Sequence, residues 1–194
     1  MRLTRNGLLT TLLVIVALLV GSTLTRHLPD PNEFRDAPYP VAGVLGEPVR
    51  LRTGEITLTG VRSARTVEIF GNVAATTGVW LVVDVTYEPL HEPGLMAGSQ
   101  ARVEALDGRQ FGGLQPVTNN CGPANPGLPV ACQLPFEVDD AALEGLVLAI
   151  PALAENWGAD HVTAIDLGIT AERAEELRAS EDHVVLLRPR VVER

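Results

Sequence analysis

The chain has 194 residues and a formal net charge of −9, and 46% of its residues are hydrophobic. Its 15 basic residues are all arginine and are scattered along the sequence. Nucleic-acid binding needs a clustered basic face, so we expect no nucleic-acid partner. The absence of lysine indicates codon bias in a high-GC genome, and selection of guanidinium groups for phosphate or carboxylate binding is the alternative.

The N-terminal segment, residues 7–25, contains no charged residue and has about the length that a helix needs to cross a bilayer core. Arg2 and Arg5 precede it, and Arg26 is the single arginine that follows closely. The positive-inside rule then places residues 1–6 in the cytoplasm as a short tail. We therefore predict a single-pass anchor in the cell membrane, with the C-terminal domain extracellular.

A cleaved signal peptide is the alternative for this segment. Signal peptides combine a basic start, an apolar stretch and small residues at the cut site, and residues 20–22 offer a weak cut site. Cleavage there would release a secreted domain.

Residues 26–46 contain four prolines and no sustained periodicity, which predicts an extended linker of the polyproline type. Alternatively, residues 39–45 pack on the domain as an irregular lead-in. The folded extracytoplasmic domain is predicted to span residues 47–194, which is enough for one hydrophobic core.

Strand patterns dominate that domain. Apolar residues alternate over residues 49–51 and 56–58, with a possible turn at residues 53–54. Residues 78–90 give the clearest pattern, because β-branched and apolar residues recur there with period two. We expect the odd-numbered face of this strand to lie in the core; its members are Val79, Leu81, Val83, Val85 and Tyr87.

A hairpin is predicted around residues 107–108, an Asp-Gly pair between the strand-like residues 100–106 and 109–111. The next strand, residues 132–138, contains Pro135 and should therefore be an edge strand or carry a bulge there. Further strands are expected at residues 143–150, 161–169 and 183–187, and one short helix at residues 170–180, capped by Thr170.

These elements predict an all-β fold: a β-sandwich of about seven to nine short strands with one short C-terminal helix.

Cys121 and Cys132 enclose a loop rich in proline and glycine, which favours a structural disulfide. A zinc site is the first alternative, but it needs more ligands than this neighbourhood offers. Redox chemistry is the second, and it usually uses a Cys-x-x-Cys spacing.

The order of the motifs resembles the immunoglobulin-like exported domains of Gram-positive bacteria, grouped with telokin-like and secreted-antigen sandwiches. Three segments carry the resemblance: Gly78 with its long apolar strand, the turn and aromatic of residues 106–111, and the strands at 134–138 and 143–148. It spans residues 47–169. The proline-rich disulfide loop and the helix at 170–180 depart from the pattern. The resemblance implies a binding or accessory module and supplies no catalytic residue.

No catalytic motif stands out among the serines, carboxylates or glycine loops. A metal site would require the Asp160-His161 and Asp182-His183 pairs to meet, and exposed turns are the simpler interpretation. Trp80 fits a core position, although it could form a ligand surface, and Trp157 is the better candidate for an exposed interaction surface. The basic group of Arg188, Arg190 and Arg194 is interpreted as a solvated tail.

We therefore predict a non-enzymatic accessory or interaction module of the cell envelope that binds another envelope protein or a membrane complex, with no metal and no cofactor. An extracytoplasmic ligand-binding receptor or an enzyme, with a site near the disulfide loop, is the alternative. A structural subunit of a membrane assembly is the third hypothesis.

Overall fold

The structure is a computed structural model that describes residues 5–27, 39–113, 115–151 and 160–193. The chain divides into two compact units, Met1–Ala37 and Pro38–Arg194. In the first unit, helix α1 runs from Arg5 to His27. Hydroxyl groups inside it bond back to the preceding turn, for example Thr11 Oγ1 to the carbonyl of Gly7 at 2.9 Å. Among the helices of the described residues, none has both the length and the apolar character that a bilayer crossing needs.

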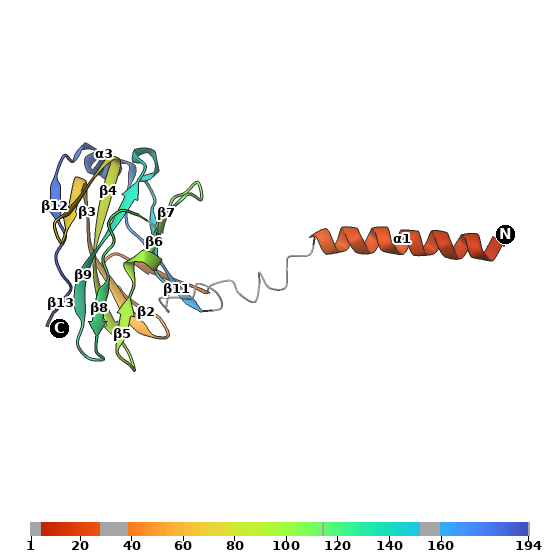
Figure 1. The fold of residues 1–194 in the computed structure, drawn as a ribbon, viewed down its shortest axis with the longest axis horizontal. Helices are drawn as coiled ribbons and strands as arrows, with labels where there is room; N and C mark the ends of the chain where they lie inside the picture. The colour runs from red at the N-terminus through yellow and green to blue at the C-terminus, as the bar shows by residue number, and fades with distance from the viewer. Residues whose placement is uncertain (1–4, 28–38, 114, 152–159, 194) are drawn as a thin grey trace. The chain divides into compact units, whose positions relative to one another are not determined.

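The second unit is a two-layer β-sandwich (Figure 1). Its strands are β1 (Tyr39–Val44), β2 (Pro48–Arg50), β3 (Gly54–Ile69), β4 (Asn72–Pro89), β5 (Gly94–Met96), β6 (Arg102–Glu104), β7 (Gln110–Gly112), β8 (Cys121–Ala124), β9 (Val130–Val138), β10 (Val147–Ala149), β11 (His161–Asp166), β12 (His183–Val185) and β13 (Arg190–Val191). Helix α3 (Ala171–Ala179) and the short 3-10 turns η1 (Gly98–Gln100) and η2 (Asp140–Ala142) complete it.

Sheet A contains five strands in the order β1-β11-β10-β6-β7. Sheet B contains six: β12-β3-β4-β9-β13 form a continuous path, and β2 pairs with β3. A small third sheet joins β5 to β8. The main core lies between sheets A and B, where Leu81, Leu134 and Phe136 of sheet B cluster with Val103 and Leu148 of sheet A.

The predicted sandwich is therefore confirmed, although the described residues form thirteen strands rather than seven to nine. Some of the additional strands, such as β5 and β13, have only two or three residues, whereas β12 falls within the strand predicted at residues 183–187. A segment that short shows no alternation in the sequence, because period two needs four or more residues to become visible. The predicted strand at 143–150 is likewise shorter, since β10 covers only Val147–Ala149.

Strand β1 lies within the segment predicted as a linker, residues 26–46. It pairs in parallel with β11, with Tyr39 opposite His161 and Val44 opposite Asp166. Gly43 allows β1 to lie close to β2, because a Cβ atom at that position would meet Val49 Cγ2 at 2.2 Å. The sandwich thus begins at Tyr39 rather than at residue 47. The sequence did not reveal β1 for two reasons: the four prolines favoured a linker, and the partner strand is more than a hundred residues away.

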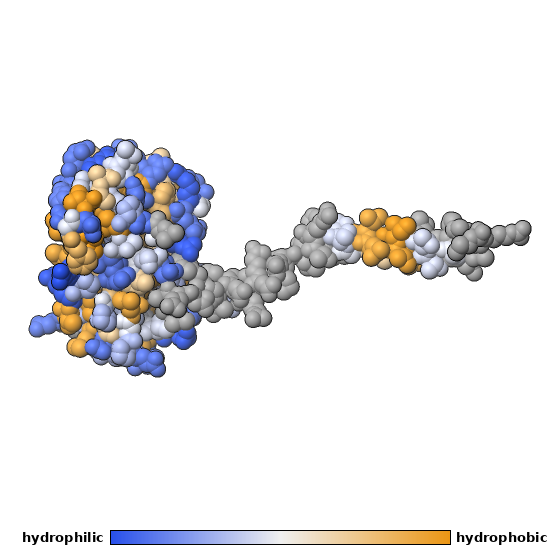
Figure 2. Space-filling model, viewed as in Figure 1, coloured by the Kyte–Doolittle hydropathy of each residue, from blue (hydrophilic) through white to orange (hydrophobic). Residues whose placement is uncertain are grey.

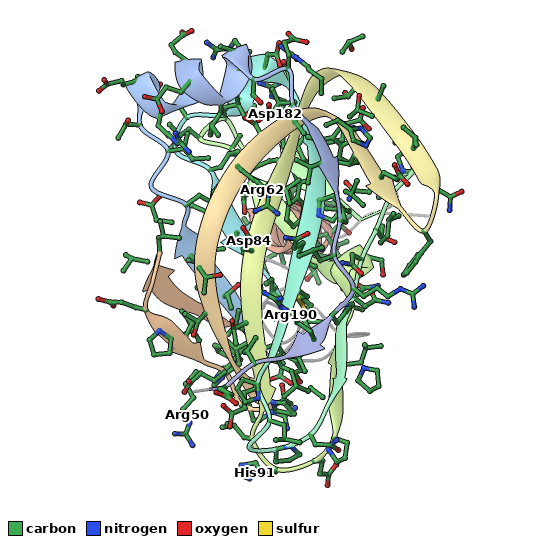
Figure 3. All side chains as sticks on the ribbon, turned by 90° about the vertical axis from the view of Figure 1, so that its left-hand side faces the viewer. Arg50, Arg62, Asp84, His91, Asp182 and Arg190 are labelled. Carbon is green, nitrogen blue, oxygen red and sulfur yellow. A yellow bond between two sulfur atoms is a disulfide. The ribbon has the colours of Figure 1, made fainter. Side chains whose placement is uncertain are left out.

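The odd-numbered face of β4 lies in the main core, as predicted. The opposite face is buried too in the middle of the strand, where Trp80 is 0% exposed and joins a second cluster on the outer side of sheet B. The β3–β4 hairpin covers it. Its register shifts between Ala64 and Thr66, so that residues 76–79 of β4 lie opposite the single residue 65. The hairpin bends there (Figure 3), and we call its distal part, residues 66–75, the arm.

Pro135 lies on a free stretch of the edge of sheet B, as the sequence predicted. Strand β9 pairs with β4 along its length but with β13 only at Val130 and Ala131. The side chain of Gln115 takes the place of a neighbouring strand: its amide donates to the carbonyl of Pro135, and its Oε1 accepts from the backbone N–H of Glu137 at 3.3 Å. The missing N–H of proline therefore faces no partner strand.

Helix α3 matches the predicted helix closely. Thr170 caps it by accepting a hydrogen bond from the backbone N–H of Arg173 at 3.3 Å. Ala174 and Leu177 are buried in the main core, whereas Ala171, predicted on the same side, is exposed. Arg65 fastens the C-terminal end of the helix, because its guanidinium donates to the carbonyl of Arg178 at 2.8 Å.

Candidate functional site

The outer face of sheet B carries a charged network that starts at Asp84 on strand β4. Its Oδ2 accepts a hydrogen bond from Arg62 Nη1 at 2.7 Å, and its Oδ1 accepts one from Gln133 Nε2 at 3.0 Å. Alternation places these side chains on the face opposite the main core, because β4 carries its odd-numbered residues inward. Figure 3 shows Arg62 and Asp84 on this side of the sheet.

The C-terminal segment crosses this face. Strand β12 pairs with the arm at Thr66–Glu68, whereas β13 pairs with β9 at the other side of sheet B. Residues 186–189, which we call the strap, connect the two strands. Two side chains of the sheet region fasten the strap: Gln133 Oε1 accepts from the backbone N–H of Leu187 at 2.8 Å, and Asn119 Nδ2 donates to its carbonyl at 3.3 Å.

A hollow of about 210 Å³ lies between the strap and the sheet. Sheet B contributes Thr59, Asp84, Val85, Ala131, Cys132 and Gln133 to it, and the C-terminal segment contributes Leu187, Arg188 and Arg190. Its walls thus combine one carboxylate, already bonded, with two guanidinium groups. Arg190 lies on the same side of the sheet as Asp84 (Figure 3).

Arg188 and Arg190 are exposed, as predicted for a solvated tail, and they also line this hollow. The guanidinium of Arg188 lies over the ring of Phe70, 5.1 Å from its centroid, which holds the side chain by a cation–π contact. Arg190 is exposed, and among the described residues no carboxylate lies within ion-pair distance of it. Arg194 lies outside the described residues.

A second, more open hollow lies at the other end of β9. Thr76, Thr77, Gly78 and Phe111 line it together with the acidic residues Glu137, Asp139 and Asp140. Its carboxylates already have partners. The backbone N–H of Ala141 and the guanidinium of Arg109 lower the pKa of Asp139, and Arg65 pairs with Asp140 at 3.4 Å. This arrangement stabilises the corner of the fold.

Large apolar side chains are exposed on the arm and on the C-terminal segment beside it. Phe70 is 66% exposed, Val73 60%, Val185 54% and Leu187 52%. Val73 pairs with Glu68 and Glu68 pairs with Val185, so both valines lie on one face of neighbouring strands. We call these four residues the apolar patch. Figure 2 shows apolar surface on the side of the domain where β12 and β3 lie.

The cysteines of the sequence analysis are paired: Cys121 and Cys132 form a disulfide with their Cα atoms 5.3 Å apart. It joins β8 to β9, and Cys132 also lines the hollow under the strap. Trp157, the predicted interaction surface, lies outside the described residues.

The hypothetical metal site does not assemble. Asp160 and His161 belong to sheet A, whereas Asp182 and His183 lie beside the arm of sheet B. Among the described residues, no three metal-binding side chains cluster. Asp160 instead pairs with Arg52 at 2.6 Å, which links the two sheets. The hydrogen bond from Arg52 is the main cause that lowers the pKa of Asp160.

No protein-family model and no curated protein matches this sequence. Two solved structures match this chain at low structural similarity. The YjhA protein of Bacillus subtilis has 10% identity and a TM-score of 0.44, with 64% of this chain and 99% of that chain covered. An uncharacterized β-sandwich protein of Clostridium difficile has 12% identity and a TM-score of 0.41, with 71% and 99% covered.

The hollow is not visible in the sequence, because its walls come from distant segments. Thr59 and Arg190 are separated by more than a hundred residues, and the strap brings them together. The only local signal was the Arg188-Pro189-Arg190 tripeptide, in which proline favours an extended chain and places both arginines near each other.

Proposed function

We propose that this protein is a non-enzymatic accessory or interaction module of the cell envelope, which binds another envelope protein through the arm side of sheet B. The observation that carries this proposal is the apolar patch. Scattered exposed hydrophobic residues are ordinary, but neighbouring ones on a strand edge are typical of interaction surfaces. Phe70 is well suited as an anchor, because aromatic residues contribute disproportionately to binding energy.

The edge position of β12 supports the same surface. A strand at the end of a sheet leaves backbone groups for a partner to pair with, and β12 ends the hydrogen-bonded path of sheet B. Val185, the last residue of β12, and Leu187, which follows it, supply apolar contacts at that edge. A partner strand or loop could thus combine backbone pairing with burial of the patch.

The extracellular location is part of the proposal and rests on the amino-acid sequence. The uncharged residues 7–25, preceded by Arg2 and Arg5, fit a membrane anchor with the domain outside, or a leader that is cleaved after export. The Cys121–Cys132 disulfide fits an oxidising compartment. The immunoglobulin-like affiliation also stays a proposal, supported by the strand motifs of residues 47–169.

Site-specific crosslinking in intact cells tests the surface. A photoreactive amino acid replaces Phe70 in one variant and Leu128 in a matched control, since Leu128 is also a large exposed residue but lies away from the arm. We expect an envelope protein to crosslink from position 70 and not from position 128. Adding Val185→Asp should abolish the product. Crosslinks only to a second copy of this chain, or equal yields from both positions, would overturn the proposal.

A ligand-binding receptor is the second candidate, and the hollow under the strap is the observation that favours it. The hollow lies beside Cys132. The carboxylate in its lining pairs with Arg62 and not with the guanidinium groups that line the hollow.

A further inference from the structure

We propose that the hollow between the strap and sheet B is a binding site for a carboxylate group. The hollow adjoins the apolar patch, because Leu187 belongs to both and Arg188 lies over the ring of Phe70. The proposal names the chemistry of a ligand, whether that carboxylate belongs to a small organic acid or to the end of a peptide.

The charge in the hollow favours an anion although the whole chain carries −9. Among the described residues that line it, Asp84 is the one acidic residue. Both oxygens of that carboxylate already accept hydrogen bonds, and its partner Arg62 balances its charge. Arg188 and Arg190, which are both exposed, then remain as an excess of two positive charges beside the hollow. Electrostatic interactions near a protein surface are still stronger than in bulk water.

The geometry of the C-terminal segment presents these two groups together. Arg188 and Arg190 flank Pro189, which restricts the backbone between them. The strap is fastened at Leu187 by Gln133 and Asn119, and β13 is fastened by its pairing with Ala131 and Val130. Both arginines therefore project from a backbone held at two ends, so that binding a ligand need not order a free tail.

Two side-chain contacts distinguish the arginines. The contact of Arg188 with the ring of Phe70, 5.1 Å from its centroid, favours one position of that guanidinium. Arg190 has no carboxylate partner among the described residues and is free to rotate toward a ligand. A planar guanidinium with a fixed array of donors matches a planar carboxylate, which accepts two parallel hydrogen bonds.

The size of the hollow fits a ligand larger than a lone ion. Its volume of about 210 Å³ exceeds the roughly 30 Å³ share of one water molecule several-fold. The apolar side chains on this face of the hollow, Ala131 and Leu187, can contact a short carbon chain attached to the carboxylate, whereas Val85 points into the main core. The hollow thus suits an aliphatic acid or a chain terminus.

The test is a titration of the full chain, held in a neutral detergent and labelled with ¹⁵N in its arginines. The Nε–Hε signals of Arg188 and Arg190 are assigned from Arg→Lys variants and followed as sodium succinate is added at constant ionic strength. A dipeptide with a free C-terminal carboxylate is titrated separately, as is its amidated form. We expect the Arg190 signal to shift and saturate with succinate or with the free-acid dipeptide, and not with the amide.

Arg190→Gln should weaken that binding by about tenfold or more, as expected for the loss of a charge-assisted hydrogen bond. The matched control is Arg50→Gln, since Arg50 is an exposed arginine of sheet B away from the hollow (Figure 3), and it should leave affinity within about twofold. Thermal unfolding of each variant shows that the fold is intact.

The probe that saturates the shift of the Arg190 signal at the lower concentration identifies the source of the carboxylate, either a small organic acid or the end of a peptide. Shifts that grow linearly without saturation, equal shifts at Arg50 and Arg190, or equal binding of the amidated dipeptide would overturn the proposal. Tighter binding of inorganic phosphate than of either carboxylate would overturn the assignment of the ligand class.

Discussion

Replacing Trp80 tests how the arm is held on the outer face of sheet B. This side chain is completely buried, in a cluster that includes Val67 of the arm and Leu186 of the strap. A tryptophan buries about 150–250 Å². At about 25 cal/mol per Å², that burial corresponds to about 4–6 kcal/mol. Because alanine retains its own small share, Trp80→Ala should lower the free energy of unfolding by about 3–5 kcal/mol.

Trp80→Phe should cost much less, about 2 kcal/mol at most. The indole Nε1 is buried and has no hydrogen-bond partner among the described residues, so phenylalanine removes no bond. Loss of an unpaired buried N–H offsets part of the lost packing, because such a group carries a penalty of about 1–3 kcal/mol.

Urea denaturation followed by far-UV circular dichroism measures both variants on the full chain in a neutral detergent. Hydrogen exchange shows where the variant loses structure. Trp80→Ala should raise amide exchange in the arm and in β12 well above the rate set by global unfolding. Leu81→Ala is the control, since Leu81 is the neighbouring residue on the opposite, intersheet face. An equal loss of unfolding free energy in Trp80→Phe and Trp80→Ala would refute the claim that the indole N–H has no hydrogen-bond partner. Unchanged protection of the arm would refute its attachment through Trp80.

Three further changes probe the rest of the fold. Replacing both cysteines of the Cys121–Cys132 bond by alanine should destabilise the domain by about 3 kcal/mol, measured by urea denaturation, because the bond closes a loop of 11 residues. Asp160→Asn should destabilise the domain at neutral pH, and the difference from the wild type should vanish in acid as measured by unfolding at each pH. The sign follows from the lowered pKa of Asp160 beside Arg52: its stabilisation is present above the ordinary carboxyl pKa and is lost as pH falls through the folded value. Gln115→Ala should cost about 1–2 kcal/mol and expose a backbone N–H of β9, seen as faster exchange of that amide.

Each of these changes has its own control. A reducing agent should lower the unfolding midpoint of the wild type but leave the cysteine-free variant unchanged, and an equal shift in both would contradict the disulfide effect. For the ion pair, a wild-type advantage over Asp160→Asn that persists at low pH would contradict the assignment. Gln110→Ala, an exposed glutamine on the β6–β7 hairpin, should change stability by less than about 0.5 kcal/mol.

Local patterns in the sequence determined a large part of the fold. The alternation of residues 78–90 predicted which face of β4 enters the core, because side chains of a strand point to opposite faces with period two. The Asp107-Gly108 pair predicted the turn between β6 and β7, since Gly108 supplies a positive φ of 84°. The cap at Thr170 and the disulfide loop are signals of the same short range.

The tertiary structure decided what covers the outer face of sheet B. The sequence contains Trp80, but its burial there depends on the bend of the arm, which a register shift in the β3–β4 pair produces. The tertiary structure also decided the position of β1, because its partner β11 lies more than a hundred residues later in the sequence.

The candidate site depends most strongly on the tertiary structure. Arg188 and Arg190 line the same hollow as Asp84 only because the strap crosses from the arm to β9. Periodicity and turn chemistry describe residues that are close in sequence, and they carry no information on which distant strands become neighbours. That choice is made by the joint burial of apolar surface, which depends on the whole chain at once.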